Sequence, residues 1–377
     1  MTTTTGTTTT ATAAVLRGQD DDFTFEQITL GALQPGEILV RTTATGLCHT
    51  DLAVQHGHIP SPFPVVLGHE GAGVVEQVGP DVTEFAVGDR VAVSFTSCGH
   101  CDACRSGRAA YCESFMALNI GGAREDGTTT LRSAEDGHDG ETVHGSFFGQ
   151  SSFATAMIAS VRNAVKVPDD VPLELVGPLG CGIQTGAGTV LNSLDVRAGE
   201  SIVVSGTGAV GLSGIMAARA AGATTIIAVD ILDSRLEMAT KLGATHTINS
   251  TREDVVETVQ AATGGVGAMH ALDTTGIPAV IETVMNATRF GATTAAVGVG
   301  KPDAVLPQGL VSGAGRNLIG AIEGDAVPQV FIPRLLDLYR AGLFPFDQLI
   351  TTYPFAELEQ AIADTQSGAA VKAVLTM

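Results

Sequence analysis

Four of the six cysteines lie close together in this chain, as Cys98, Cys101, Cys104 and Cys112. Thiolates with two residues between them can reach one side of a metal ion. Three such thiolates, with a fourth after a short loop, can form a tetrahedral cage around zinc. Three other uses of such a cluster stay open: disulfides, a redox-active thiol pair, and an iron–sulfur cluster, whose familiar ligand runs have other spacings. We predict a structural zinc site. All its coordination positions would be filled by the protein, so it would hold a loop and not catalyse.

The two other cysteines, Cys48 and Cys181, form a second candidate site with His69 of the GHEG segment. Two thiolates and one imidazole leave the fourth position of a zinc ion open, and such an ion acts as a Lewis acid on an alcohol or carbonyl oxygen. Taken singly, a lone cysteine is more often a small buried hydrophobic residue. Asp51 is expected to accept an N–H from a ligand histidine, and Glu70 to tune the metal electrostatically. Either could instead be a solvated or ion-paired carboxylate.

A glycine-rich turn carries the next candidate chemistry. Gly206, Gly208 and Gly211 form G-x-G-x-x-G between an apolar strand pattern and a helix of small residues, and Asp230 ends the following apolar strand. This is the context of a dinucleotide-binding turn, whose glycines let the backbone approach a pyrophosphate at a helix N-terminus. We expect Asp230 to bind the adenosine ribose and to repel a 2′-phosphate, which favours NAD over NADP. The alternative is that the glycines only pack a helix against a strand.

These sites need elements to position them, and the strand and helix patterns predict an α/β protein of two domains. We expect a disordered threonine-rich tail over 1–14 and a β-rich catalytic domain over 15–182. A doubly wound parallel-sheet NAD-binding domain is expected over 183–325, and residues 326–377 are expected to return to the catalytic domain.

Composition and charge restrict the partners. The 377-residue chain has a formal net charge of −20, which disfavours nucleic acid and anionic membranes as partners. No stretch reaches the roughly 18 apolar residues of a membrane span, and residues 1–14 lack the basic and apolar regions of a signal peptide. We therefore expect a cytoplasmic protein in a reducing compartment that binds small molecules.

The motifs together resemble those of the zinc-dependent medium-chain alcohol dehydrogenases over nearly the whole chain. The segment GHEGAGVVEQVGPDVTEFAVGDRV, the four-cysteine cluster, the GTGAVG turn and Asp230 all fall where that family has its motifs. The resemblance implies a GroES-like catalytic domain, a Rossmann coenzyme domain and a homodimer or homotetramer. Two further segments, HGSFFGQSSFATAMIAS and GAIEGDAVPQVFIPRLL, are most similar to the aryl- or benzyl-alcohol dehydrogenase branch, which includes oxidisers of allylic terpene alcohols.

The resemblance also implies roles for single residues. Cys48, His69 and Cys181 would hold the catalytic zinc, and Thr50 would take the proton of the substrate hydroxyl. Ala53 departs from the family, because many relatives have there the histidine that passes the proton on. Cofactor contacts are implied for Thr185 and Val210 at the nicotinamide, Val299 at its carboxamide, His49 and Lys372 at the pyrophosphate, and Arg235 near the adenosine ribose.

The predicted function is the reversible, NAD-linked oxidation of a primary aromatic or allylic alcohol to the aldehyde, with two zinc ions per chain. Phe95 and Phe148 are expected to contribute to an apolar substrate pocket. Two alternatives remain from the sequence. One is a thiol-dependent formaldehyde dehydrogenase, which would need cationic residues to bind a carboxylated adduct. The other is a catalytically inactive, metal-stabilised binding protein.

Overall fold

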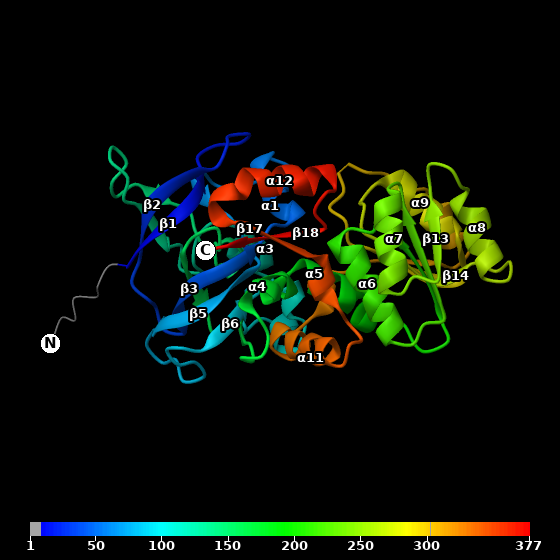
Figure 1. The fold of residues 1–377 in the computed structure, drawn as a ribbon, viewed down its shortest axis with the longest axis horizontal. Coiled ribbons are helices and arrows are strands. Elements are labelled where there is room, and N and C mark those ends of the chain that lie inside the picture. The colour runs from blue at the N-terminus through cyan, green and yellow to red at the C-terminus, as the bar shows by residue number, and fades with distance from the viewer. Residues whose placement is uncertain (1–8, 302) are drawn as a thin grey trace. The chain divides into compact units, whose positions relative to one another are not determined.

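The computed structural model describes residues 9–301 and 303–377, which divide into two compact units (Figure 1). The first unit extends to Cys181 and includes Val327–Ile332 and Leu349–Met377, while the second comprises Gly182–Ala326 and Pro333–Gln348. Residues 333–348 therefore group with the second unit, whereas the sequence placed them in the returning part of the catalytic domain.

The first unit is built on two sheets. The smaller sheet has the strand order β4-β1-β2-β7-β8, and the larger one has the order β10-β6-β5-β3-β18-β17, with β9 paired to β3. Pairing of the last strand with β3 returns the end of the chain to this unit. The bounds are β1 (Thr9–Leu16), β2 (Thr24–Leu30), β3 (Glu37–Gly46), β4 (Val65–Val66), β5 (Gly71–Val78), β6 (Arg90–Val93), β7 (Leu131–Ser133), β8 (Thr142–Val143), β9 (Ala156–Ser160), β10 (Ala164–Lys166), β17 (Ile350–Pro354) and β18 (Lys372–Thr376).

Strand β1 corrects the expected tail. The sequence predicts disorder over 1–14, but residues from Thr9 onward pair with β2 in antiparallel register. Ala13, Ala14 and Val15 are fully buried there, so the small apolar residues supply a buried face that the threonine repeat does not. Threonine is also a favourable strand residue because it is β-branched. Residues 1–8 lie outside the described residues.

Short helices surround the sheets of the first unit. Helix α12 packs against β18, and α4 packs against β3. The core between these elements is apolar and includes Phe147, Phe153 and Leu67. The helices are α1 (His49–Gln55), α2 (Asp102–Arg105), α3 (Phe115–Ile120), α4 (Leu173–Val176) and α12 (Leu358–Ser367).

The second unit contains one parallel sheet of six strands in the order β13-β12-β11-β14-β15-β16. In order along the chain this is 3-2-1-4-5-6, the arrangement of the doubly wound dinucleotide-binding fold. The predicted fold class is confirmed. The strands are β11 (Ser201–Ser205), β12 (Thr225–Asp230), β13 (His246–Asn249), β14 (Ala268–Asp273), β15 (Thr288–Ala296) and β16 (Asn317–Gly320). The helices named below or in Figure 1 are α5 (Gly182–Gly188), α6 (Ala209–Ala220), α7 (Asp233–Leu242), α8 (Val255–Ala262), α9 (Pro278–Asn286) and α11 (Pro328–Arg340), of which α11 contains the division between the units.

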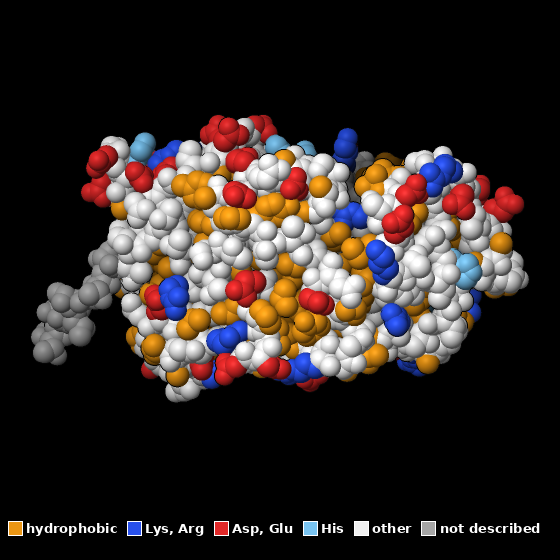
Figure 2. Space-filling model, viewed as in Figure 1, with side chains coloured by type: hydrophobic (Ala, Val, Ile, Leu, Met, Phe, Trp, Pro, Cys, Tyr) orange, Lys and Arg blue, Asp and Glu red, His pale blue; other side chains and the backbone are white. Residues whose placement is uncertain are grey.

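The surface agrees with the acidic composition. Carboxylate side chains are spread over the face shown in Figure 2, with lysine and arginine side chains set among them. Within the described ranges, the helices are too short or too polar for any of them to cross a membrane.

Candidate active site

The structure brings Cys48, His69 and Cys181 together in the first unit, and Glu70 joins them. One ligand atom from each of the four residues lies within 4.8 Å of the others. Cys48 directly precedes α1, His69 and Glu70 directly precede β5, and Cys181 follows the 3₁₀ helix Gly177–Gly180. Three distant parts of the sequence therefore deliver one potential metal ligand set.

Glycines make this convergence sterically possible. A Cβ atom at Gly46 would lie 1.9 Å from Oε2 of Glu70, and one at Gly177 would lie 2.2 Å from the carbonyl oxygen of Glu70. Both contacts are far shorter than a carbon–oxygen van der Waals contact. The segment that carries Glu70 can approach the neighbouring segments this closely only because these two positions lack a side chain.

Asp51 fixes the ring of His69. Its Oδ1 atom accepts hydrogen bonds from Nδ1 of His69 at 3.0 Å and from the Gly68 amide at 3.1 Å, and its Oδ2 atom accepts one from the Cys48 amide at 3.0 Å. Asp51 and His69 are both fully buried. The other ring nitrogen, Nε2, is buried without a hydrogen-bond partner among the described residues. An imidazole held at Nδ1 by a carboxylate and open at Nε2 is arranged as a metal ligand.

The pKa shifts of these ligand side chains also favour a bound cation. A hydrogen bond with Cys181 lowers the pKa of Cys48 well below its ordinary value, assisted by His69 and opposed by burial. Burial lowers the pKa of His69, but Asp51 and Cys48 together raise it well above its ordinary value. A positive charge is therefore favourable at the centre of this group, and a bound metal ion supplies one while the imidazole stays neutral.

Glu70 and Lys372 form a buried ion pair beside the ligands. The Lys372 ammonium donates to Oε1 and Oε2 of Glu70, both at 2.9 Å, and to the carbonyl oxygen of Leu47 at 3.1 Å. Burial raises the pKa of Glu70 to about 7, against the opposing charge of Lys372. The pyrophosphate contact expected for Lys372 stays a prediction. The ammonium is buried and binds these three oxygen atoms of the first unit.

The four-cysteine cluster also converges. One sulfur atom from each of Cys98, Cys101, Cys104 and Cys112 lies within 4.8 Å of the others, and all six cysteines of the chain are free of disulfides. The Cys98 amide donates to the Cys112 sulfur at 3.3 Å, and the Cys101 amide donates to the Cys98 sulfur at 3.4 Å. These main-chain hydrogen bonds hold the sulfurs inward around a common centre.

The thiols of the cluster differ widely in pKa. Main-chain amides lower the pKa of Cys101 to about 6, whereas burial raises the pKa of Cys112 to about 12. Four thiolates in one place need a divalent cation to compensate their charge. Four sulfur ligands without an open position fit structural zinc.

Aromatic rings extend from His69. Phe148 stacks on the imidazole with ring centroids 4.5 Å apart and an angle of 25° between the planes, and Phe147 meets the same imidazole edge-on at 5.4 Å. Phe115 contacts both Phe148 and Phe95, at 6.3 and 5.9 Å. The two predicted pocket residues, Phe95 and Phe148, thus belong to one aromatic cluster. The sequence reasoning missed Phe115 and Phe147, although the paired phenylalanines in SFFGQS were a visible signal.

The remaining predicted residues of this unit lie on or beside α1. Thr50 places its hydroxyl oxygen 3.7 Å from the sulfur of Cys48 and is partly exposed. His49 is exposed, as a contact with a phosphate group would require. Ala53 is buried.

The glycine turn of the second unit connects β11 to α6. Gly206 has a φ of 81°, which favours glycine, and a Cβ atom at Gly211 would lie 1.9 Å from the carbonyl oxygen of Gly206. A Cβ atom at Gly208 would meet no atom within 4 Å, so the turn is open at this glycine. The three positions match the tight turn, the close helix packing and the open approach that a pyrophosphate needs.

Asp230 lies at the end of β12 and reaches back to this turn. Its Oδ2 atom accepts hydrogen bonds from the amide and the hydroxyl of Thr207, both at 2.7 Å. Its Oδ1 atom accepts from the amides of Ile231 and Leu232. The carboxylate is thus fixed in direction by the turn, a contact that the sequence reasoning did not foresee.

The other predicted cofactor residues of the second unit occupy three places. Thr185 lies in α5 and Val210 in α6, and these two helices pack closely at Gly186. Val299 is exposed and follows β15. Arg235, in α7, is mostly buried, and burial lowers its pKa although Asp230 raises it.

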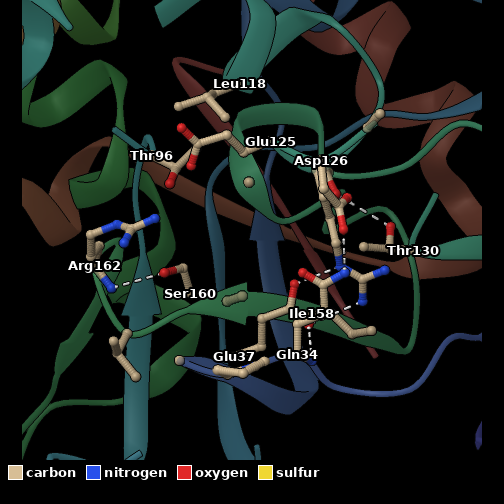
Figure 3. A pocket seen from close by; sticks show the side chains of 18 residues that line it. Gln34, Glu37, Thr96, Leu118, Glu125, Asp126, Thr130, Ile158, Ser160 and Arg162 are labelled. Atoms are coloured by element: carbon tan, nitrogen blue, oxygen red, sulfur yellow. Dashed lines mark hydrogen bonds and ion pairs between the residues drawn. The ribbon is translucent and has the colours of Figure 1, made fainter. Parts of the chain in front are cut away.

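A cavity of about 420 Å³ lies elsewhere in the first unit (Figure 3). Its wall includes Gln34, Thr96 and Arg162, and an ion pair between Arg124 and Glu37 with Nε and Oε1 2.6 Å apart. The residues that line it include none of the predicted metal ligands. The ligand groups, and not this cavity, therefore mark the chemistry of the chain.

Two family models match this chain: the alcohol dehydrogenase GroES-like domain over residues 34–169 and the zinc-binding dehydrogenase over residues 209–340. The geraniol dehydrogenase of Castellaniella defragrans is 47% identical over 367 residues, which make up 96% of this chain and 96% of that protein. The chain belongs to the zinc-binding alcohol dehydrogenase family.

Solved structures agree with this membership. The benzyl alcohol dehydrogenase of Acinetobacter calcoaceticus is 42% identical, with a TM-score of 0.93 and coverage of 98% of this chain and 99% of that one. An alcohol dehydrogenase zinc-binding domain protein from Burkholderia ambifaria is 50% identical, with a TM-score of 0.94 and coverage of 98% and 99%. The predicted family and enzyme class are confirmed, and so is zinc as a cofactor: the protein is an alcohol dehydrogenase of the zinc-binding type that acts on small alcohols and aldehydes.

Proposed function

We propose that this alcohol dehydrogenase oxidises a primary aromatic or allylic alcohol to the aldehyde with NAD, and that it also catalyses the reverse reduction. The observation that carries the proposal is the aromatic cluster that begins at the ring of His69 and continues through Phe148 and Phe115 to Phe95. Flat, conjugated substrates gain about 0.5–1.5 kcal/mol from aromatic contacts beyond the burial of their area. The names of two relatives, a geraniol and a benzyl alcohol dehydrogenase, support the same substrate class.

We assign the open zinc site to Cys48, His69 and Cys181, and the closed site to the four-cysteine cluster. The unpartnered Nε2 atom of His69 and the thiolate preference of Cys48 fit the open site. Zinc held by these three side chains supplies a Lewis acid that favours ionisation of an alcohol hydroxyl. Asp51 keeps the proton of His69 on Nδ1, so that Nε2 remains available as a ligand.

Thr50 is the proton acceptor in this proposal. Its hydroxyl stands beside Cys48 at the exposed end of the ligand group, where a substrate hydroxyl would lose its proton. Ala53 offers no titratable group, so the proton leaves Thr50 by a route without the usual histidine. Positioned acid–base groups contribute roughly 10²–10⁴-fold to rate, and we expect Thr50→Ala to lower kcat by at least about a hundredfold.

The second unit supplies the cofactor site. Gly206, Gly208 and Gly211 would receive the pyrophosphate of NAD, and Asp230 its adenosine ribose. Held by these residues, NAD would supply the acceptor for the hydride of the alcohol. Thr185, Val210 and Val299 would border the nicotinamide.

A substrate series tests the proposal. The purified, zinc-loaded enzyme is assayed with NAD and benzyl alcohol, geraniol, hexanol and ethanol, by the absorbance of NADH. Each methylene is worth about 0.8 kcal/mol on burial, so hexanol controls for size without conjugation. We expect benzyl alcohol or geraniol to exceed ethanol in kcat/KM by at least about a hundredfold and to exceed hexanol clearly. Equal values for ethanol and benzyl alcohol would refute the aromatic or allylic substrate class.

A further inference from the structure

The segment from Ser146 to Ser151, here called the SFFGQS turn, has an unusual main-chain path. The φ angles are 57° at Ser146, 50° at Phe148, 67° at Gly149 and 58° at Ser151, so three residues with side chains adopt the left-handed region. Such a path persists only where the surroundings impose it. Ser146 and Gly149 line the 420 Å³ cavity, so packing is incomplete on that side of the turn. Hydrogen bonds must therefore hold it.

The side-chain amide of Gln150 makes the central contacts. Its Oε1 atom accepts a hydrogen bond from the Gly71 amide at 2.9 Å, and its Nε2 atom donates to the carbonyl oxygen of His69 at 2.9 Å. The same Nε2 atom reaches the carbonyl oxygens of Val93 at 3.3 Å and Ser94 at 3.2 Å. Gln150 is 2% exposed, so water does not compete for these partners.

These contacts bracket one residue. Gln150 binds the main chain at His69 and at Gly71, on both sides of Glu70, and a Cβ atom at Gly71 would lie 2.8 Å from Oε1 of Gln150. The short segment is therefore fixed in position and orientation. Its two side chains are used in different ways: His69 faces the ligand group, and Glu70 binds Lys372.

The same turn holds the ring that stacks on His69. Nδ2 of Asn163 donates to the carbonyl oxygens of Phe148 and Gly149, at 3.3 and 3.1 Å. The Ser151 hydroxyl accepts from the Phe147 amide at 3.0 Å and donates to Val66 at 2.7 Å. The left-handed conformation of Phe148 is thus enforced at both ends.

We propose that Gln150 is a positioning residue of the active site. It orients the His69 imidazole in two ways: directly, through the main chain of residues 69–71, and indirectly, by anchoring the turn that lays Phe148 on the ring. Together with the Asp51 contact at Nδ1, this fixes the direction of Nε2 before a metal ion binds. The inference rests on the proposed role of His69 as a zinc ligand but not on the identity of the alcohol.

The test compares Gln150→Met with the wild-type enzyme. Methionine keeps the volume and the apolar stem but removes the four hydrogen bonds. We expect affinity for the catalytic zinc to fall about 10–100-fold, the range seen when partners of metal ligands are removed. The four-cysteine site should keep its zinc, kcat should fall at least about tenfold, and KM for the alcohol should change less. The d–d absorption bands of enzyme with cobalt in the open site should shift, which a loss of general stability would not cause.

Gln55→Met is the matched control. Gln55 is also a buried glutamine of the first unit, and its amide donates to the main chain of Asp21 at 3.0 Å. This variant should retain the wild-type cobalt spectrum and zinc affinity even if its melting temperature falls. If Gln150→Met does not fold, Gln150→Glu replaces it. Its carboxylate keeps the size and the Gly71 contact but faces the carbonyl oxygens of His69, Val93 and Ser94.

The outcomes separate the proposals. A folded Gln150 variant with an unchanged cobalt spectrum, zinc affinity and kcat overturns the positioning role, as does failure of both variants to fold, which would make Gln150 a folding determinant. Retention of the open-site metal by His69→Ala would refute the ligand role itself. Preference for ethanol in the substrate series would refute only the substrate class and leave the role of Gln150 intact.

Discussion

Asp51 and His69 are joined by a hydrogen bond of 3.0 Å between Oδ1 and Nδ1, in a place from which water is excluded on all sides of both side chains. We predict that Asp51→Asn weakens binding of the catalytic zinc about 10–100-fold. Asparagine retains an acceptor for Nδ1, but it loses the negative charge and turns a donor toward the amide of Cys48. The measurement is competition with a chromogenic chelator on the folded protein.

A second Asp–His pair provides the control for this change. Asp20 contacts Nδ1 of His56, also at 3.0 Å, but both side chains are exposed. Asp20→Asn should leave zinc affinity and turnover as in the wild type, since an exposed pair of this kind contributes little. Equal zinc affinity in Asp51→Asn and Asp20→Asn would show that the buried contact does not serve the metal.

Mutations should distinguish the two metal sites. The wild-type chain should bind two zinc ions, and Cys98→Ser and Cys48→Ser should each bind one, by elemental analysis. Cys98→Ser should chiefly lower the melting temperature, because a structural zinc ion contributes its binding free energy to folding. Cys48→Ser should abolish turnover and leave the fold largely stable. A wild-type preparation of full activity with a single zinc ion would contradict the assignment of two sites.

Local patterns were the most informative part of the sequence. Cys98 to Cys112 converge because their spacing leaves the chain little choice, and the strand–turn–helix around Gly206 follows from adjacent elements. The parallel, doubly wound sheet could be predicted for the same reason, since strand and helix patterns alternate along this part of the chain. The convergence of Cys48, His69 and Cys181 depended on the family resemblance, because distant segments bring them together.

Contacts between distant residues were not predictable in this way. Lys372 and Glu70 lie 302 positions apart in the sequence, and nothing in either segment indicates that they form an ion pair. Gln150 stands between Gly149 and Ser151, where nothing in the sequence indicates that its amide is buried or which groups it binds. The strand at Thr9 was missed because a threonine repeat gives no alternation to detect, although its pairing with β2 buries the following alanines.

Asp230 should govern the choice of cofactor. The wild-type enzyme should prefer NAD to NADP by at least about tenfold in kcat/KM, since one repelled or unsatisfied polar group costs about 1–3 kcal/mol. Asp230→Ser should narrow this preference. Because Asp230 also binds the amide and hydroxyl of Thr207, the same change should raise KM for NAD by loosening the glycine turn.

Thr207→Val separates these two effects. It removes one hydrogen bond to Asp230 and leaves the carboxylate charge in place. KM for NAD should rise while the ratio of NAD to NADP efficiency stays near the wild-type value. A loss of cofactor preference in Thr207→Val as large as in Asp230→Ser would show that turn geometry, and not charge, selects the cofactor.

Tyr353 should ionise only at high pH. Burial raises its pKa to about 12, and its hydroxyl donates to Asp364 at 2.8 Å, which opposes formation of the phenolate. A raised pKa in the folded state contributes stability below the ordinary pKa of tyrosine, about 10, and this stability is lost as pH rises toward about 12. With three tyrosines and no tryptophan in the chain, absorbance of tyrosinate at pH 11 is readable. Asp364→Asn should show more tyrosinate than the wild type. Asp337→Asn, which changes an exposed carboxylate paired with Arg340, should not.

Removing one partner of the Glu70–Lys372 ion pair should destabilise the protein strongly, whereas replacing both partners together should destabilise it less. Removing one partner of a buried pair costs about 3–5 kcal/mol, because the other charge is left without compensation. We therefore expect Lys372→Met and Glu70→Gln each to lower the free energy of unfolding by about this amount in denaturant titrations at pH 8. The double variant should be more stable than either single one, since it buries no charge.

The stability of Lys372→Met as a function of pH tests the same argument through the protonation of Glu70. With Lys372 present, burial already raises the pKa of Glu70 to about 7, and without the ammonium it must rise further. A carboxyl group with a raised pKa is best tolerated in its neutral form, so Lys372→Met should regain stability as pH falls from 8 to 6. Glu70→Gln/Lys372→Met has no such group and should show no gain beyond that of the wild type over this range. A deficit in Lys372→Met that stays constant with pH would mean that the lysine contributes by packing its apolar stem and not by compensating the charge of Glu70.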